Sequence, residues 1–533
     1  MGSINVREMN VLFFEQMLKE IDWVNVRYSY PSKLRFPESF SIMAYLIGID
    51  VGSSSVKASV LDSSTGACVG DAFFPKTEQI IASPQPGFAE QDPQLWYDSA
   101  KLAVREAMER AQISPESVAA IGIAYQMHGL VCVDVDQNVL RPAIIWCDSR
   151  AVDHGAKAFA DLGEDRCLDH LLNSPGNFTA MKLAWVRDNE PELFSRIDRV
   201  MLPGDWLAMR LTGDARTTES GLSEGIFWDF KENELCGFLM ENEGFSPELI
   251  PDRVGTFSIQ GELTTDAAFD FGLKAGTPIS YRGGDQPNNA LSLNVLQPGE
   301  VAATGGTSGV VYGVTDQVKY DPKSRVNTFL HVNHTVEDPR LGILLCINGT
   351  GIFNSWTRRL LGDVNFTEMN ELANSVDVGS DGLIALPFGN GAERVLGNRN
   401  PGAQLAGLDF NRHGRAHLCR ALQEGIVFSF QYGIDIMKPL GLEISKIRAG
   451  RANMFLSDLF CQTLASVSGA SIELYETDGA LGAARGAGVG AGIYSSLEEA
   501  FSNLAKVKTI EPESGTHGEA YQRWLDKLST TLV

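Results

Sequence analysis

The chain has 533 residues, which is too long for one compact domain and long enough for two large ones. Apolar residues make up 44% and charged residues 21%, a composition that can bury two cores and is unlike that of a disordered protein. The formal net charge of −23, without a run of Lys and Arg, argues against nucleic-acid binding.

From residue 45 onward, strand patterns, helix patterns and glycine turns alternate, which is typical of an α/β protein. A polar tip, Gly52-Ser53-Ser54, separates two apolar runs and predicts a hairpin. In chain order the first half predicts strands at Tyr45–Val51 and Ser55–Leu61, a helix at Leu95–Ala111, a buried strand at Val118–Ala124, and helical segments at Leu183–Val186 and Trp206–Leu211.

The second half begins with similar pieces. Pro278–Tyr281 predicts a strand that runs into Gly283-Gly284-Asp285, with a helix after it. Gly299–Ala303 and Val310–Val314 predict a second hairpin around Thr304–Gly309. If the two halves face each other, both glycine hairpins open onto one cleft. Asp478–Gly492 is rich in Gly and Ala and predicts a closely packed helix.

The first hairpin carries residues suited to phosphate and metal. Asp50 ends a buried strand, where its charge is costly unless a partner such as Mg²⁺ compensates it. Gly52, Ser53 and Ser54 can turn N–H groups and hydroxyls toward a phosphate, and Lys57 adds a positive charge. A serine-capped turn without a ligand is the alternative interpretation.

The second hairpin has the same chemistry. Its tip offers Gly306, which lets the backbone approach a phosphate closely, and the hydroxyl donors of Thr307 and Ser308. The tip has no acidic residue that would repel a phosphate. A simple turn is again the alternative. Two such hairpins on one cleft favour phosphate binding, one near the β-phosphate and the other near the γ-phosphate.

Asp285 admits a structural and a functional interpretation. It follows two glycines at a strand end and precedes a helix with Pro287 in its first turn, so it could be the N-cap of that helix. It also lies at the carboxyl end of a strand, where α/β folds bind ligands. There its carboxylate could accept a proton from a hydroxyl group.

Several ordered motifs together resemble the FGGY carbohydrate kinases over residues 45 to 500. The first hairpin resembles the family's Asp-x-Gly-(Thr/Ser) phosphate motif, and Gly283-Gly284-Asp285 stands where the family carries its catalytic base. Ala449-Gly450-Arg451-Ala452-Asn453 stands at the adenosine motif, which normally opens with three glycines. The remaining matches are Glu90-Gln91-Asp92-Pro93 with Trp96, Gln126-Met127-His128-Gly129, Trp146-Cys147-Asp148-Ser149-Arg150, Lys182-Leu183-Ala184-Trp185, Pro387-Phe388 with Gly391–Arg394, and Gly479–Ala484.

This resemblance implies a two-domain actin-like ATPase (ribonuclease H-like) fold with an interdomain cleft, and transfer of a phosphoryl group from ATP to a sugar. It implies Asp285 as the base, Asp50 as the Mg²⁺ ligand, and Gln126, Met127, His128 and Trp146 as sugar contacts, although Trp146 could equally lie in the core. ATP would contact the following residues: Asp50, Gly52, Ser53, Ser54, Lys57, Gly306, Thr307, Ser308, Gly450, Arg451 and Asn453.

The resemblance favours a ketose as the substrate, with D-xylulose first. Ribulose, glycerol or a similar polyol is the alternative within the family, and a sugar- or ATP-binding protein without transfer activity is the alternative outside it. Asp50 and Asp285 are both present, which argues against the non-catalytic alternative. A small-molecule sugar and ATP are the expected partners, without nucleic acid or membrane, and a homodimer is one expected assembly.

The chain is expected to be cytoplasmic. Its eight cysteines are scattered without a Cys-x-x-Cys pair, which indicates reduced thiols, and no apolar run approaches the ~18 residues of a membrane span. We expect three parts, namely an extension at 1–42, a sugar-binding domain with the first hairpin and the base at 43–293, and a domain with the second hairpin and the adenosine site at 294–533.

The segment 1–42 carries no residue of a family motif and is expected to lie outside the core, with one helix around Val11–Ile21. Ser29–Ser41 holds two prolines and little periodicity. A chain that starts at Met43 is therefore expected to keep its kinase activity and its thermal midpoint almost unchanged. Activity assays and thermal denaturation of both chains check this, and a large drop in either quantity would contradict it.

Overall fold

The computed structural model describes residues 44–392 and 394–532. The chain divides into two units, Met1–Ile42 and Met43–Val533, and the description below concerns the second. The predictions for residues 1–42, including the helix around Val11–Ile21, lie outside the described residues.

The first sheet has six strands in the order β13-β14-β5-β1-β2-β3. β1 pairs with β2 as an antiparallel hairpin and with β5 in parallel, and β14 is parallel to β5. The strands predicted in this half are confirmed, and the β14 strand runs further than predicted, through Gly284. Their bounds are β1 Tyr45–Val51, β2 Val56–Asp62, β3 Cys68–Phe74, β5 Val118–Tyr125, β13 Gly261–Glu262 and β14 Pro278–Gly284.

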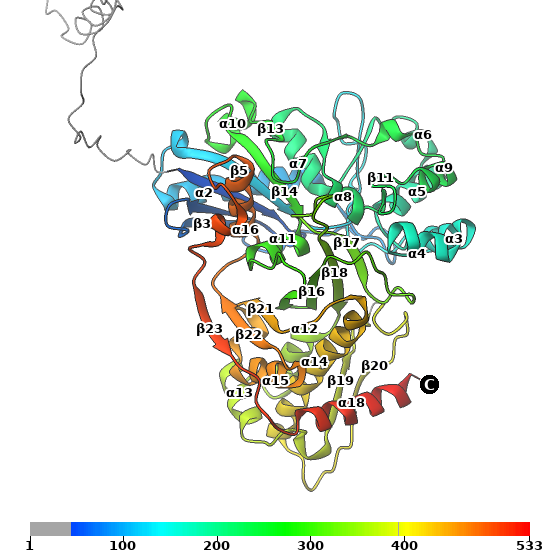
Figure 1. Cartoon of the computed structure of the whole chain (residues 1–533), viewed down its shortest axis with the longest axis vertical. Helices are drawn as coiled ribbons and strands as arrows, with labels where there is room; N and C mark the ends of the chain where they lie inside the picture. Colours follow the sequence, from blue (N-terminus) through cyan, green and yellow to red (C-terminus); the bar gives the residue numbers. More distant parts are fainter. Residues whose placement is uncertain (1–43, 393, 533) are drawn as a thin grey trace, which may run out of the picture. The chain divides into compact units, whose positions relative to one another are not determined.

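Helices cover this sheet on its two faces, which explains why β1 and β5 are buried almost throughout. α2 (Pro93–Ala111) packs against β2 and β3, and α16 (Gly479–Gly490) packs against β1, β5 and β14 (Figure 1). A β-carbon at Gly48 would lie 1.7 Å from the Ala480 oxygen. The close approach therefore requires glycine, and the predicted tight packing of the Gly/Ala helix is confirmed.

The second sheet has seven strands in the order β17-β18-β16-β15-β21-β22-β23. β15 and β16 form an antiparallel hairpin and β15 runs parallel to β21, so this sheet repeats the arrangement of β1, β2 and β5. The bounds are β15 Glu300–Gly305, β16 Gly309–Thr315, β17 Asn327–Leu330, β18 Leu341–Ile347, β21 Lys446–Gly450, β22 Ser471–Tyr475 and β23 Lys506–Ile510.

Helices and a further hairpin pack around the second sheet, with the long helix α14 at their centre (Figure 1). Its helices are α12 Thr350–Leu360, α13 Phe366–Asn374, α14 Arg415–Met437, α15 Asp458–Ser468 and α18 His517–Thr531, and the hairpin is β19 Ile384–Phe388 with β20 Gly402–Ala406. Among the described residues, no helix is long and apolar enough to cross a membrane.

The remaining elements lie around the first sheet and in the connections. The helices are α3 Val152–Leu162, α4 Glu164–Leu171, α5 Thr179–Asn189, α6 Pro191–Phe194, α7 Pro203–Thr212, α8 Glu219–Glu224, α9 Gly237–Glu243, α10 Thr265–Phe271, α11 Asp285–Ser292 and α17 Leu497–Phe501. The short strands are β4 Glu90–Gln91, β6 Val131–Val133, β7 Ala143–Ile144, β8 Arg199–Met201, β9 Arg216–Thr217, β10 Trp228–Asp229, β11 Glu234–Leu235 and β12 Asp252–Arg253.

Candidate active site

Three neighbouring strands of the first sheet end at one edge, and each delivers a predicted site residue there. Asp50 of β1 and Gly283 of β14 both lie opposite Ala124 of β5. Parallel strands bring their carboxyl ends to the same edge, so Asp50, the segment Gln126–His128 and Asp285 are neighbours. The register alone thus assembles the metal, sugar and base candidates.

Asp285 is the first residue of α11, and Gly284 is the N-cap, so the prediction that Asp285 caps this helix is wrong. β14 extends through Gly284, and this places the glycine at the boundary. Protein atoms surround the Asp285 carboxyl group, although the residue remains partly accessible. This burial first, and the charge of Asp50 second, raise the pKa of Asp285 to about 7.

Asp50 lies beside two other carboxylates. Burial first, and the charge of Asp478 second, raise its pKa to about 6, while Lys57 lowers it. The Lys57 ammonium forms an ion pair with Asp478 at 2.5 Å and lies 3.7 Å from Asp71, so its charge is directed at α16 and β3. The described residues contain no group of three or more His, Cys, Asp or Glu side chains that could hold a metal alone.

The donors around Asp50 nevertheless fit a hard cation shared with a ligand. Mg²⁺ is commonly bound through one or two carboxylates together with phosphate oxygens and water. Asp50 and Asp285 repel each other electrostatically at this strand edge, and a cation there would relieve that repulsion.

The tip of the first hairpin is tied to the sugar side of the site. The Gln91 amide donates to the Ser53 carbonyl oxygen at 2.7 Å, and the Trp146 indole N–H donates to Ser53 Oγ at 3.3 Å. The turn itself is closed by Gly52 N–H, which donates to the Ser55 oxygen at 3.1 Å. Ser53 therefore joins the predicted phosphate and sugar residues.

Gln126 and Met127 are buried behind this edge. The Gln126 amide donates to Gln91 Oε1 at 3.3 Å, and Gln91 Oε1 also accepts from the Trp96 indole at 3.0 Å. Gln126 Oε1 is buried and has no hydrogen-bond partner among the described residues. This orphaned acceptor is available to a ligand hydroxyl.

His128 is held in one tautomer. Its Nδ1 lies 2.9 Å from the Glu224 main-chain oxygen, which can only accept, so Nδ1 carries a proton. Burial first lowers the His128 pKa, to about 3, so the ring is neutral and Nε2 is an acceptor. The backbone of His128 has a φ of 60°, and its carbonyl oxygen accepts a hydrogen bond from Lys182 Nζ at 2.6 Å.

Trp146 is 46% exposed, so the alternative that it is a core residue is wrong. It lines a pocket of about 520 Å³ together with Thr307 and Ser308 of the second hairpin and with Arg394. This pocket joins the two halves of the chain. Because Trp146 also contacts Ser53, both hairpins meet the same region.

Gly306, Thr307 and Asn453 line a second pocket, of about 420 Å³. The start of α12 closes one side of it, where Gly351 N–H donates to the Gly306 oxygen at 3.0 Å. The residues that line this pocket do not include Gly450 and Arg451. Gly450 ends β21, and the exposed Arg451 pairs with Glu476 at 3.2 Å.

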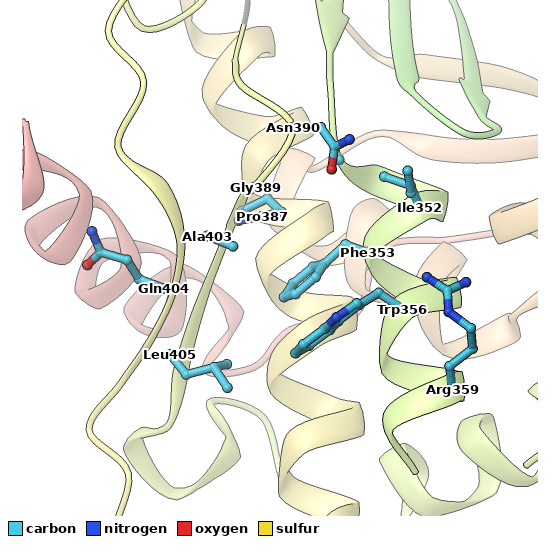
Figure 2. Close-up of a pocket in the computed structure, with 11 residues that line it drawn as sticks. Ile352, Phe353, Trp356, Arg359, Pro387, Gly389, Asn390, Ala403, Gln404 and Leu405 are labelled. Atoms are coloured by element: carbon cyan, nitrogen blue, oxygen red, sulfur yellow. The ribbon is translucent and has the colours of Figure 1, made fainter. Parts of the chain in front are cut away.

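A third pocket, of about 560 Å³, lies between α12 and the β19–β20 hairpin (Figure 2). Phe353 and Trp356 stack with ring centroids 6.0 Å apart and point from α12 toward β20. Gly349, Ile352 and Asn390 line both this pocket and the one beside Trp146. None of the predicted site residues lines it.

Sequence reasoning gave no role to several residues that hold this site together. Arg150 binds Glu90 at 2.8 Å and Asp148 at 2.7 Å, and Asp148 also accepts from the Ala89 N–H at 2.6 Å. This network joins two motifs on which the resemblance rests. Glu224 was missed as well, because its contacts with His128 and Gly284 are made between residues far apart in the sequence.

Comparison with known proteins identifies the class to which this fold and this strand-edge site belong. Residues 45–292 match the N-terminal domain, and residues 301–491 the C-terminal domain, of the FGGY family of carbohydrate kinases. The chain belongs to this family and is a sugar phosphotransferase. The sequence-based recognition is thereby confirmed.

Among individual relatives, xylulose kinases are prominent. The xylulose kinase of Escherichia coli (strain K12) is 30% identical over 483 residues, which cover 89% of this chain and 96% of that protein. The L-xylulose/3-keto-L-gulonate kinase of the same organism is 29% identical over 498 residues, or 90% and 95%. The structure of a xyloylose kinase from Brucella ovis superposes with a TM-score of 0.80 at 27% identity and covers 91% and 99%. The predicted actin-like fold is confirmed.

Proposed function

We propose that this chain phosphorylates D-xylulose to D-xylulose 5-phosphate with ATP. One observation supports the proposal: Asp285, the segment Gln126–His128 and Asp50 follow or end neighbouring parallel strands at one edge of the first sheet. In the proposal they act as the base, the sugar site and the phosphate-side carboxylate. The similarity to xylulose kinases supports the ketose over other sugars. In this proposal residues 43–293 bind the sugar and residues 294–533 bind the adenosine.

The sugar is held by Gln126, His128 and Trp146. Gln126 Oε1 accepts a hydrogen bond from one hydroxyl, and the Nε2 acceptor of the neutral His128 ring takes another. The half-exposed Trp146 ring lies against the apolar face of the sugar. Because Gln126 is also held by Gln91, its side chain is already ordered and loses little entropy when the sugar binds.

Asp285 accepts the proton of the terminal hydroxyl as the hydroxyl oxygen attacks the γ-phosphorus in line. The new O–P bond forms as the bond to the β,γ-bridging oxygen breaks, ADP leaves with that electron pair, and the proton stays on Asp285 until product release. Gly306, Thr307 and Asn453 hold the nucleotide, with the hydroxyl and N–H groups of both hairpins near its phosphates. Asp50 would hold Mg²⁺, which when bound neutralises phosphate charge.

The activity is expected to fall as the pH drops through the pKa of Asp285, because only the ionised carboxylate can accept a proton. Its pKa in the free protein is raised to about 7, so kcat/KM should decrease toward acid from near neutrality. A cation bound at Asp50 would offset the negative charge of Asp50, which is the second cause of the raised Asp285 pKa. With ATP and Mg²⁺ present, kcat should therefore fall toward acid at a lower pH than kcat/KM does. Rates that stay constant from about pH 8 to about pH 5 would contradict the base assignment.

A phosphorylation screen over pentuloses, hexuloses and glycerol tests the substrate. D-Xylulose should show the highest kcat/KM, and a higher value for ribulose or glycerol would favour the alternative within the family, since pocket shape decides between such sugars. Binding of sugar and ATP without phosphate transfer to any of them would favour the non-catalytic alternative.

A further inference from the structure

Glu224 is a buried carboxyl group without an obvious partner. It is the last residue of α8 and only 2% exposed, and neither carboxyl oxygen has a well-aligned hydrogen bond among the described residues. The Tyr125 hydroxyl interacts with the carboxyl group but is itself left without a well-aligned partner. An unpaired buried polar group is costly, so its presence calls for an explanation.

The carboxyl group rests on the strand that carries the base. A β-carbon built on Gly284 would lie 2.7 Å from Glu224 Oε2 and 2.8 Å from Met127 Cγ. Gly284 is the residue directly before Asp285, and Met127 belongs to the sugar segment. The absence of a side chain at Gly284 thus leaves the space that the Glu224 carboxyl group fills.

The backbone of the same residue holds the sugar ligand. The Glu224 carbonyl oxygen accepts from His128 Nδ1 at 2.9 Å and thereby sets which ring nitrogen faces the ligand. Glu224 therefore contacts the sugar segment through its main chain and the end of β14 through its side chain.

We propose that Glu224 is a positioning residue that fixes Asp285 relative to His128, so that the base meets the hydroxyl that His128 and Gln126 orient. This inference rests on the proposed function. Such alignment matters because a displacement of about 1 Å in a site can cost about 10²-fold in rate.

The surroundings of Glu224 agree with this role. Burial first, and the charges of Asp285 and Asp205 after it, raise its pKa well above the ordinary value, against the opposing effects of Tyr125 and Lys182. The site therefore disfavours a second negative charge beside Asp285.

The test compares E224Q, which keeps a neutral polar group of the same shape, with E224M, which keeps the volume and removes the polar atoms. With D-xylulose and ATP, E224M should raise KM for the sugar and lower kcat, for a loss in kcat/KM of about 10²-fold. KM for ATP should stay within about twofold, because Glu224 lies on the sugar side. E224Q should recover most of the loss.

E219Q and E219M provide the matched control, since Glu219 begins the same helix but is only partly buried and pairs with Arg253 at 3.4 Å. Wild-type kcat/KM in E224M would overturn the inference, as would equal losses in E224Q and E224M accompanied by equal drops in thermal midpoint. If E224M does not fold, E224L, which also fills the space and removes the polar atoms, takes its place with the same expectations.

The proposed function is tested apart from the role of Glu224. It is wrong if the wild type does not phosphorylate D-xylulose. The comparison of E224Q with E224M is then made with whichever sugar the wild type phosphorylates best. Loss in E224M with recovery in E224Q on that sugar would still support the role of Glu224.

Discussion

Replacing Asp285 by Asn is expected to lower xylulose-dependent turnover by about 10²–10⁴-fold, the usual cost of losing a general base. Asparagine has nearly the same shape but cannot take a proton from the attacking hydroxyl. Sugar binding should persist, because the proposed sugar contacts Gln126 and His128 are unchanged. Steady-state kinetics and calorimetric titration with D-xylulose measure the two effects separately.

The fold of D285N should be at least as stable as that of the wild type. The raised pKa of Asp285 shows that its environment disfavours the charge, and the substitution removes the repulsion with Asp50. Thermal midpoints at neutral pH check this expectation. D153N is the matched control, because Asp153 is an exposed aspartate in the first turn of α3. Near-normal turnover in D285N would leave Asp285 with only a structural role at the start of α11.

Local pattern was sufficient to predict the elements that deliver the site. The apolar runs at Tyr45–Val51 and Val118–Ala124 appear as β1 and β5, and the glycine tips between strands form both hairpins. Such features depend on neighbours in the sequence, so they can be read from it. The cap of α11 was assigned wrongly because β14 continues through Gly284, and the end of a strand depends on its pairing with β5.

Contacts between distant residues could not be read in the same way. Lys57 pairs with Asp478, 421 residues away, and α16 returns from the end of the chain to cover the first sheet. Lys57 was predicted to contact phosphate because its positive charge lies near a glycine tip. Its ion pair with Asp478 could not be predicted from the neighbouring residues. Glu224 gave no signal for the same reason, because its importance comes from Gly284, Met127 and His128, which the fold brings to it.

Replacing Asp50 by Asn is expected to reduce magnesium-dependent turnover by about 10²-fold or more, the scale on which a site loses rate when an electrostatic group at the phosphate is removed. Asp50 lies near the end of β1 and is the carboxylate proposed for the phosphate side of the site, and its pKa is raised by burial and by Asp478. An amide there cannot attract a cation as a carboxylate does, so higher Mg²⁺ concentrations should recover part of the rate.

The affinity for the sugar should change little in D50N. The proposed sugar contacts, Gln126, His128 and Trp146, come from the chain that follows β5 and not from β1. Calorimetry with D-xylulose, and with ATP and Mg²⁺, separates the two ligands. D71N serves as the control, because Asp71 also lies near Lys57, at 3.7 Å, but is on β3, away from the strand edge that carries Asp285. If D50N lost sugar binding while ATP and Mg²⁺ still bound normally, Asp50 would belong to the sugar site, and the division of roles between the strand ends would have to be reversed.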